Sequence, residues 1–191
     1  MSEAQPVASR KLYFLVSLSI LILDQASKLA AIRWLVPRGT IEVIPSLFNL
    51  TYSENPGGLF GYFGQWPDPW RTLLLTALPM VAIGMIGWFL ARGEGLDRRT
   101  LFGLSLILGG AIGNLIDRLI RHSVVDFLDV YAAPSRFADW LIEHFGTTHW
   151  PTFNLADSAI VTGAGLLLLT VVLPQRDAPG APSDNPSVTA G

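Results

Sequence analysis

Four long apolar runs, separated by polar connections, dominate the pattern of the chain. They predict helices at residues 12–34, 72–91, 101–120 and 155–173. Each run is close to the ~20 mostly apolar residues that a helix needs to cross the hydrocarbon core of a bilayer. Pro79 lies inside the second run, where a membrane helix tolerates proline with a kink. We therefore predict an integral membrane protein with one domain, residues 12–173, built on four transmembrane helices.

The two long connections add a small amount of predicted β-structure. Residues 37–71 contain β-branched and aromatic residues followed by the turn sequence NPGG at 55–58, a combination typical of short strands and a turn. Residues 121–153 contain Trp140 and Trp150, side chains that suit a membrane interface. The predicted fold class is therefore a membrane all-α protein with a small β-element.

The composition agrees with a membrane protein and excludes several kinds of chemistry. Hydrophobic residues make up 50% of the chain and charged residues 15%, whereas a soluble domain carries about 25% charged residues. The formal net charge of -2 gives no reason to expect a nucleic-acid partner. The chain has no cysteine, which excludes disulfides, thiol catalysis and cysteine metal sites. The three histidines lack a tight metal-ligand spacing such as HExxH. The acid–base hydrolysis argued below implies neither a metal nor a cofactor.

The basic residues predict the orientation in the membrane. They precede the first helix, fill the connection between the second and third, and follow the fourth: Arg10, Lys11, Arg92, Arg98, Arg99 and Arg176. The positive-inside rule places these positions in the cytoplasm, although four arginines fall on the other side. We therefore expect a cytoplasmic N-terminus at 1–11, a disordered cytoplasmic tail at 174–191, and outer regions at 37–71 and 121–153.

A cleaved signal peptide is an alternative for the first apolar run. Arg10 and Lys11 precede it, as basic residues precede the apolar core of a signal peptide. The run ends, however, in polar and charged residues, and no clear small-x-small cleavage site follows it. A first transmembrane helix is therefore the favoured interpretation.

Two aspartates fall near the same predicted membrane surface. Asp126 follows the third helix, and Asp157 lies in the first turn of the fourth. Because these helices are antiparallel in the predicted topology, both carboxylates lie at the outer face. Two carboxylates in one site repel each other's charge, which separates their pKa values. Such a pair supports hydrolysis, because the ionised carboxylate takes a proton from water while the protonated one polarises a carbonyl.

Structural explanations compete with this functional one. Asn154 and Asp157 have the spacing of an N-cap and an acid in the first helical turn. Asp126 and Asp129 are alternatively solvated loop acids, and Asn55 is alternatively part of a turn. The i, i+4 spacing also fits ion pairs, interhelical contacts or side chains reaching toward the interface at three places: Asp24 with Lys28, Asn114 with Arg118, and Asp117 with Arg121.

The predicted topology nevertheless brings many polar groups to one membrane boundary. They are Asn55, Asn114, Asp117, Arg118, Asp126, Asn154 and Asp157. Ionisable groups at membrane depth are costly and are candidates for function by default. We therefore predict that these residues satisfy one another around a polar cleft. The glycines at 109, 110 and 113 allow the third helix to pack closely against its neighbours.

Five blocks of the sequence resemble the bacterial lipoprotein signal peptidase family, signal peptidase II. In order they are LDQASK (23–28), NPGGLFG (55–61), GGAIGNLIDR (109–118), VVDF (124–127) and FNLADSAI (153–160). The resemblance implies four transmembrane helices with cytoplasmic termini, a small extracytoplasmic β-cradle near residues 40–63, and a flap from the second outer region. The sequence departs from the family at Leu59, where a small residue is usual, and at 131–149, which is longer than expected.

The resemblance also implies an activity and a set of site residues. It implies a multi-pass aspartic endopeptidase of the bacterial cytoplasmic (inner) membrane, with its active site at the outer face. The substrates would be diacylglyceryl-modified prolipoproteins, cut before the lipidated cysteine by a monomer surrounded by membrane lipid. The family's catalytic pair falls on Asp126 and Asp157. Its supporting residues fall on Asp24, Lys28, Asn55, Asn114, Asp117, Arg118 and Asn154, and Asp117 either orients Arg118 or pairs with Arg121.

Three other functions fit parts of the sequence. A proton-coupled transporter or channel would use Asp24, Lys28 and Asp117 as a relay, but most titratable groups gather at one face. An intramembrane protease of another type would need a serine and a histidine on packed helices or a GxGD block; the histidines lie in outer loops and that block is absent. A non-catalytic assembly or chaperone protein would tolerate Asp126→Asn and Asp157→Asn.

Overall fold

The computed structural model describes residues 7–56, 67–132 and 136–173. The elements are α1 (Val7–Leu35), β1 (Ile41–Ile44), β2 (Phe48–Asn55), α2 (Asp68–Arg92), α3 (Arg98–Arg121), β3 (Val124–Val130), α4 (Arg136–Phe145) and α5 (Leu155–Val172). In these residues four helices, α1, α2, α3 and α5, are long and apolar enough to cross a membrane. The predicted fold class is confirmed. The tail predicted at 174–191 and Leu59 lie outside the described residues.

Three of the four long helices begin earlier than the apolar runs predict. α1 is already helical at Val7, the first described residue, rather than from 12; α2 begins at Asp68 rather than 72, and α3 at Arg98 rather than 101. Apolar runs mark the part of a helix that suits lipid, whereas helical hydrogen bonding continues into polar residues and stops at a cap. In α3 that cap is Asp97, whose side chain accepts a 2.7 Å hydrogen bond from the backbone of Thr100.

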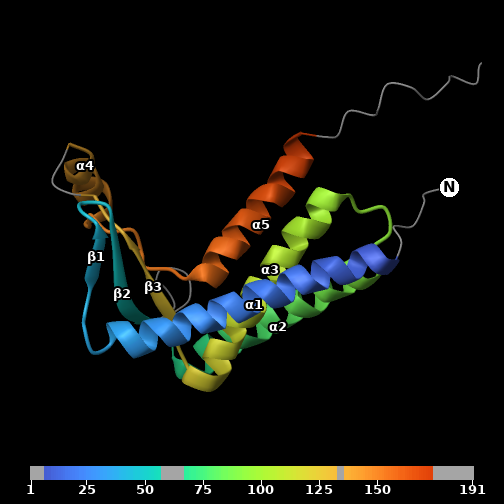
Figure 1. Ribbon diagram of the computed structural model, residues 1–191, viewed down its shortest axis with the longest axis horizontal. Coiled ribbons are helices and arrows are strands. Elements are labelled where there is room, and N and C mark those ends of the chain that lie inside the picture. Colours follow the sequence, from blue (N-terminus) through green and yellow to red (C-terminus); the bar gives the residue numbers. More distant parts are fainter. Residues whose placement is uncertain (1–6, 57–66, 133–135, 174–191) are drawn as a thin grey trace, which may run out of the picture.

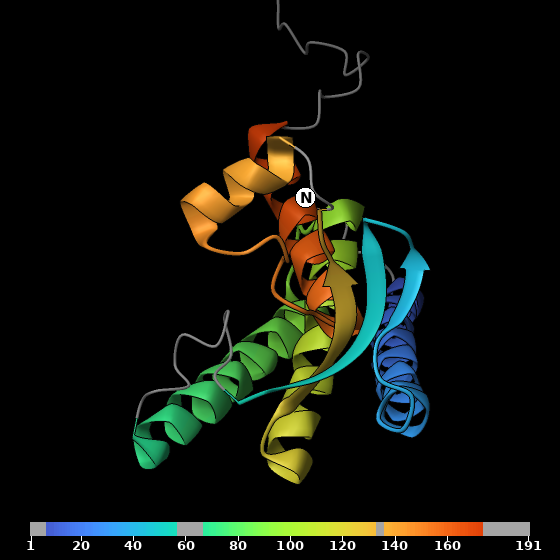
Figure 2. The ribbon, with the colours of Figure 1, turned by 90° about the vertical axis from the view of Figure 1, so that its left-hand side faces the viewer.

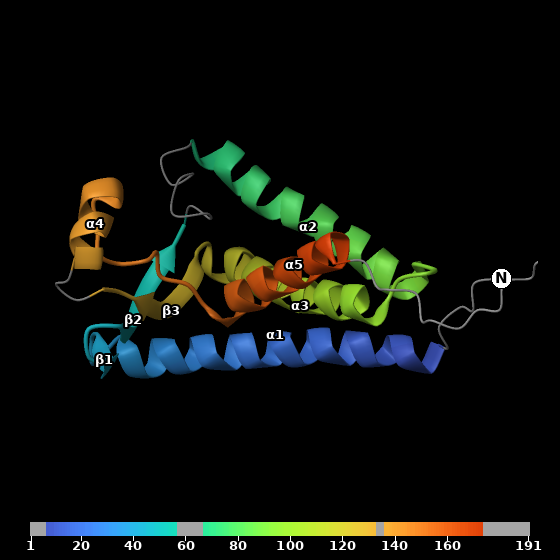
Figure 3. The same cartoon turned by 90° about the horizontal axis from the view of Figure 1, so that it is seen from above.

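α3 lies at the centre of the helical bundle. It packs against α1, α2 and α5, and Figure 3 shows α1 along one side of the bundle and α2 along the other. Small residues make the contacts of α3 close. A Cβ added at Gly110 would lie 2.5 Å from the backbone oxygen of Ala156 in α5. The predicted role of the glycines in close packing is therefore confirmed at this contact.

The three strands form one antiparallel sheet in the order β1-β2-β3 (Figure 2). β3 comes from the second connection, to which the sequence pattern assigned no strand. Ser53 of β2 is paired with Asp126 of β3. Phe127 of β3 packs against Ala31 and Leu35 of α1, which fixes the sheet to the end of that helix.

Burial of the β3 aspartates rules out one structural explanation. Asp126 is 1% exposed and Asp129 is 5% exposed. β3 is paired with β2, and both side chains accept hydrogen bonds from asparagines, Asp126 from Asn154 and Asp129 from Asn49. The idea that these two are solvated loop acids is therefore wrong.

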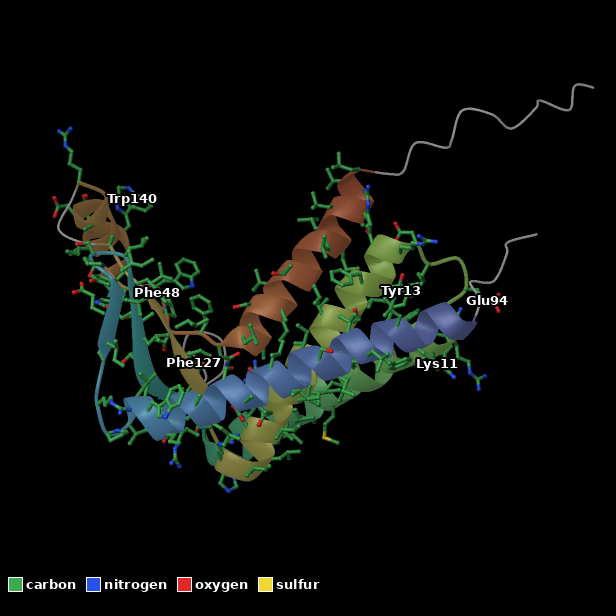
Figure 4. The ribbon with its side chains drawn as sticks, in the orientation of Figure 1. Lys11, Tyr13, Phe48, Glu94, Phe127 and Trp140 are labelled. Carbon is green, nitrogen blue, oxygen red and sulfur yellow. The ribbon has the colours of Figure 1, made fainter. Side chains whose placement is uncertain are left out.

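The sheet and α4 lie together at one end of the molecule, opposite the end where α1 begins (Figure 1). Lys11, Tyr13 and Glu94 lie at the end where α1 begins, and Phe48, Phe127 and Trp140 lie at the end that carries the sheet and α4 (Figures 1 and 4). The long connection after β3 contains α4, which the sequence pattern did not predict. Trp140 is 46% exposed and Trp150 60% exposed, so both indoles face the surroundings of the protein.

Candidate active site

A fully buried ion cluster joins α1 to α3. The ammonium nitrogen of Lys28 lies 2.9 Å from Asp24 Oδ2 and 2.9 Å from Asp117 Oδ2, and all three side chains are 0% exposed. Buried charges are stable only when they are paired and fully hydrogen-bonded. The predicted i, i+4 pair of Asp24 and Lys28 is therefore present, with Asp117 as a second carboxylate partner.

Asp24 also reaches the helix that carries Asp157. Its Oδ1 accepts a 3.0 Å hydrogen bond from the backbone N–H of Ala156, in the first turn of α5. A carboxylate is favourable there because the first N–H groups of a helix have no partner within the helix. Gly113 of α3 makes room for the Asp24 carboxylate, since a Cβ at this position would overlap it. Asp24 thus connects α1, α3 and α5.

Two asparagines connect the two aspartates. Asn114 Nδ2 donates to Asp157 Oδ1 at 2.7 Å. Asn154 Nδ2 donates to Asp126 Oδ1 at 2.8 Å and lies 3.2 Å from Asn114 Oδ1. Lys28 donates to that same Asn114 oxygen at 2.9 Å, which fixes the orientation of the Asn114 amide. A continuous hydrogen-bonded chain therefore runs from one carboxylate to the other and into the buried ion cluster.

Asn154 is at the same time the cap of α5. Its side-chain oxygen accepts from the backbone N–H of Asp157 at 2.9 Å, and Asp157 Oδ2 accepts from the backbone N–H of Asn154 at 3.2 Å. These reciprocal bonds form a capping box. The structural explanation for Asn154 and Asp157 is therefore confirmed, and it coexists with their contacts to the other polar residues.

Asp126 has an environment that favours its protonated form. Burial raises the pKa of Asp126 to about 7, and the negative charge of Asp157 adds to the rise. Hydrogen bonds from Asn55 and Asn154 and the charge of Lys28 oppose it. The Asn55 bond is 3.1 Å long and comes from the last residue of β2. A carboxyl group with a pKa near neutrality can give and take protons at physiological pH.

The remaining predicted residues and two further ones complete the cluster. Arg118 is half-buried, and its charge interacts with those of Asp157 and Asp126. Asp117 forms an ion pair with Arg121, which is one of the two pairings that the sequence left open. Gln25 was missed: its Nε2 donates to Asp24 Oδ2 at 3.1 Å and to Asp117 Oδ1 at 3.3 Å. Gln25 is a polar residue next to Asp24 inside the first apolar run, and this position could have indicated that it belongs to the same polar cluster.

The cluster is saturated with internal hydrogen bonds. In the part of the chain that the structure describes, every buried side-chain nitrogen and oxygen has a hydrogen-bond partner. The same residues contain no group of three or more His, Asp or Glu side chains placed to hold a metal ion. Two carboxyl groups held by amides at the end of a helical bundle are a suitable arrangement for acid–base hydrolysis.

Comparison with known proteins identifies the family. The signal peptidase (SPase) II family profile matches residues 16–173. The chain belongs to the signal peptidase II family. The lipoprotein signal peptidase of Maridesulfovibrio salexigens is 37% identical over 161 residues, which cover 83% of this chain and 95% of that protein. The lipoprotein signal peptidase of Solibacter usitatus is 42% identical over 151 residues, which cover 76% of this chain and 84% of that protein.

Solved structures agree with the fold. Two structures of a bacterial membrane enzyme, determined by the in meso method at 2.3 and 1.9 Å resolution, superpose with TM-scores of 0.65 and 0.66. Each is 22% identical to this chain. The matches cover 90% and 92% of this chain and 92% and 99% of those structures. At this identity the likeness concerns the fold alone.

Family membership establishes the class of enzyme. The signal peptidase II chain described here is a membrane aspartic peptidase, hence a hydrolase and an endopeptidase that removes signal peptides from lipoproteins. The four apolar helices fit a transmembrane protein. The transporter, the other intramembrane proteases and the non-catalytic protein considered as alternatives are not supported.

Proposed function

We propose that Asp126 and Asp157 form the catalytic pair of this peptidase. The observation that carries the proposal is the hydrogen-bonded chain Asp157–Asn114–Asn154–Asp126, which joins the two carboxyl groups through two asparagine amides. Asp24, Lys28, Asn55, Asn114, Asp117, Arg118 and Asn154 support the pair.

The proposed reaction is general acid–base hydrolysis without a covalent intermediate. The two carboxyl groups share one proton and hold one water molecule. The ionised carboxylate takes a proton from the water, whose oxygen attacks the scissile carbonyl carbon, while the protonated carboxyl donates to the carbonyl oxygen. The carbon–nitrogen bond then breaks: the leaving amine takes the proton that the first carboxylate received from water, and a hydroxyl of the tetrahedral carbon returns a proton to the other carboxylate, which restores the shared proton. The two groups titrate as a unit, so we assign neither aspartate as the base.

The proposed substrates are diacylglyceryl-modified prolipoproteins, cut just before the lipidated cysteine. Asp157 lies in the first turn of a membrane-spanning helix, and Asp126 lies on a strand next to the end of α3. The pair is therefore at the end of the helical bundle, where a lipid-anchored cysteine would meet it. The apolar helix of the signal peptide would lie among the four helices, with the acyl chains in the bilayer. α4 and its flanking residues would form a flap over the site.

We further propose that both termini are cytoplasmic and that the site faces the outer surface of the bacterial cytoplasmic membrane. The basic residues of the α2–α3 connection support this orientation. The chain contains no cysteine, so single cysteines introduced at Glu94 and at Thr147 can be labelled with a membrane-impermeant maleimide in intact cells. We expect labelling at Thr147 and protection at Glu94. The reverse pattern would contradict the orientation.

A cleavage assay tests the catalytic pair. The wild type, Asp126→Asn and Asp157→Asn are purified in detergent, checked for folding by thermal unfolding, and mixed with a diacylglyceryl-modified prolipoprotein. Cleavage is followed by gel shift. We expect cleavage by the wild type and none by either folded variant, because an amide can neither take a proton from water nor donate one to the carbonyl oxygen as an acid.

The control is Glu94→Gln, which removes a carboxylate from the exposed α2–α3 connection. It should cleave as the wild type does. Full activity of Asp126→Asn or of Asp157→Asn would remove that aspartate from the catalytic pair. Failure of the wild type on the lipidated substrate would contradict the proposed substrate class.

A further inference from the structure

The carboxylate of Asp117 is held on both of its oxygens. Oδ2 accepts from Lys28, and from the backbone N–H of Val125 at 3.2 Å. Oδ1 accepts from Gln25 and forms the ion pair with Arg121. The orientation of this buried carboxylate is therefore set from two sides, and Arg121 supplies the charge on the Oδ1 side.

Val125 is the residue immediately before Asp126. Its N–H donates to Asp117, and its carbonyl oxygen accepts from Asn154 Nδ2 at 3.3 Å. Asn154 Nδ2 also donates to Asp126. The backbone that leads into Asp126 is thus fixed on one side by α3 and on the other by the cap of α5. A shift of the Asp117 carboxylate would move this backbone and the side chain that follows it.

Arg121 adds a second positive charge next to the buried carboxylate of Asp117. Asp24 and Asp117 carry two negative charges, and Lys28 and Arg121 carry two positive charges. Without Arg121, the carboxylates of Asp24 and Asp117 would still share the ammonium group of Lys28. Of the two contacts given above for Asp117 Oδ1, the hydrogen bond from Gln25 would remain. A buried carboxylate that loses a cationic partner is costly, and we expect the Asp117 side chain to shift or water to enter beside it.

We propose that Arg121 is a positioning residue for the peptidase reaction. It holds the carboxylate of Asp117, and Asp117 in turn holds the Val125 amide and sets the place of Asp126. The inference rests on the proposed catalytic role of Asp126. Arg121 itself is 23% exposed at the end of α3, whereas Asp117 is fully buried. In this role Arg121 acts through Asp117 and not on the substrate.

Steady-state kinetics on the lipidated prolipoprotein test this role. We expect Arg121→Ala to lower kcat by about 10- to 100-fold, the size of effect that a small misplacement of a catalytic group produces. KM should stay unchanged, because in the proposed role Arg121 acts on Asp126 through Asp117 and not on the substrate. Arg121→Lys restores the charge without the planar fork of donors, so kcat should lie between those of Arg121→Ala and the wild type.

A matched control and a double-mutant cycle separate positioning from general destabilisation. Arg33→Ala removes an exposed arginine from the last turn of α1 and should leave kcat unchanged. Asp117→Asn combined with Arg121→Ala should lower kcat no further than Asp117→Asn alone, because both changes break one connection. All variants are compared at equal folded fraction. Where Arg121→Ala does not fold, Arg121→Lys serves alone, and a wild-type kcat for it overturns the proposal.

Failure of this inference is distinguishable from failure of the proposed function. Wild-type kcat for folded Arg121→Ala, or a raised KM at unchanged kcat, overturns the positioning role while Asp126→Asn stays inactive. Activity of Asp126→Asn overturns the catalytic assignment itself.

Discussion

Asn154 donates a 2.8 Å hydrogen bond to the carboxyl group of Asp126, and the same side chain caps the helix that carries Asp157. One residue therefore sets the position of both aspartates relative to each other. Its amide nitrogen faces β3 and its amide oxygen faces the first turn of α5. The geometry of the proposed catalytic pair depends on how α5 begins, which links the stability of a helix end to catalysis.

Substituting Asn154 by serine or by alanine separates these two roles. Serine is a good N-cap, so Asn154→Ser should keep the unfolding temperature near that of the wild type. Its short side chain cannot also reach Asp126, so the rate of cleavage should fall. Asn154→Ala loses the cap as well, at an additional cost of about 1 kcal/mol of stability. Thermal unfolding in detergent and the gel-shift assay check both expectations, and wild-type cleavage by Asn154→Ser would reduce Asn154 to a cap.

The stability of the protein should decrease as the pH rises toward neutrality. Asp126 has a pKa of about 7 when folded and an ordinary value of 3.8. Because the folded pKa is raised, the folded state binds the proton more tightly, and this contribution is complete below about pH 4 and lost as the pH passes about 7. We expect Asp126→Asn to remove this part of the pH dependence and to be more stable than the wild type above pH ~7. Thermal unfolding of both proteins across this pH range measures the difference.

A parallel loss of stability in the wild type and in Asp126→Asn would contradict this expectation. It would assign the pH dependence to other groups of the protein.

The sequence was sufficient to predict the elements that arise from local patterns. Apolar runs predicted the four long helices, and the i, i+4 spacing predicted the ion pair between Asp24 and Lys28. The Asn154–Asp157 spacing fitted the capping box that is present. These features depend on residues within one or two helical turns, so periodicity and capping rules are enough to find them.

Features that depend on packing between elements could not be predicted from the pattern. The strand that carries Asp126 has buried residues on both faces where it pairs with β2, so its sequence shows no alternation of apolar and polar residues that would predict it. The second partner of Lys28 depends on how α1 is rotated against α3. The bond from Ala156 to Asp24 joins residues 132 positions apart in sequence. Such contacts follow from the arrangement of the bundle, which the spacing of residues in one chain segment does not specify.

Asp129 should be dispensable for cleavage although it is a buried acid on the same strand as Asp126. Its carboxylate accepts from Asn49 Nδ2 at 3.0 Å and lies 2.8 Å from His149 Nδ1. These partners tie β3 to β2 and to the connection after α4. We expect Asp129→Asn to lower the unfolding temperature and to retain cleavage, whereas Asp126→Asn abolishes it. Loss of cleavage by folded Asp129→Asn, measured by gel shift, would show that this second acid takes part in the reaction.

Two glycines of α5 should respond in opposite ways to alanine. A Cβ at Gly163 would lie 2.5 Å from the backbone oxygen of Gly103 and 2.7 Å from Ile107 Cγ1, both in α3. At Gly165 no atom lies within 4 Å of an added Cβ. Gly163→Ala must therefore separate the helices or strain them, at a cost of about 1–3 kcal/mol. Gly165→Ala gains up to ~1 kcal/mol of helix propensity and is the matched control.

Gly163→Ala should also impair cleavage, because α3 carries Asn114 and α5 carries Asp157. Moving these helices apart lengthens the 2.7 Å hydrogen bond between the two side chains and loosens the proposed catalytic pair. We expect Gly163→Ala to lower both the unfolding temperature and the cleavage rate, and Gly165→Ala to lower neither. Thermal unfolding and the gel-shift assay on both variants measure this. Equal behaviour of the two would mean that the α3–α5 contact neither limits stability nor positions Asp157.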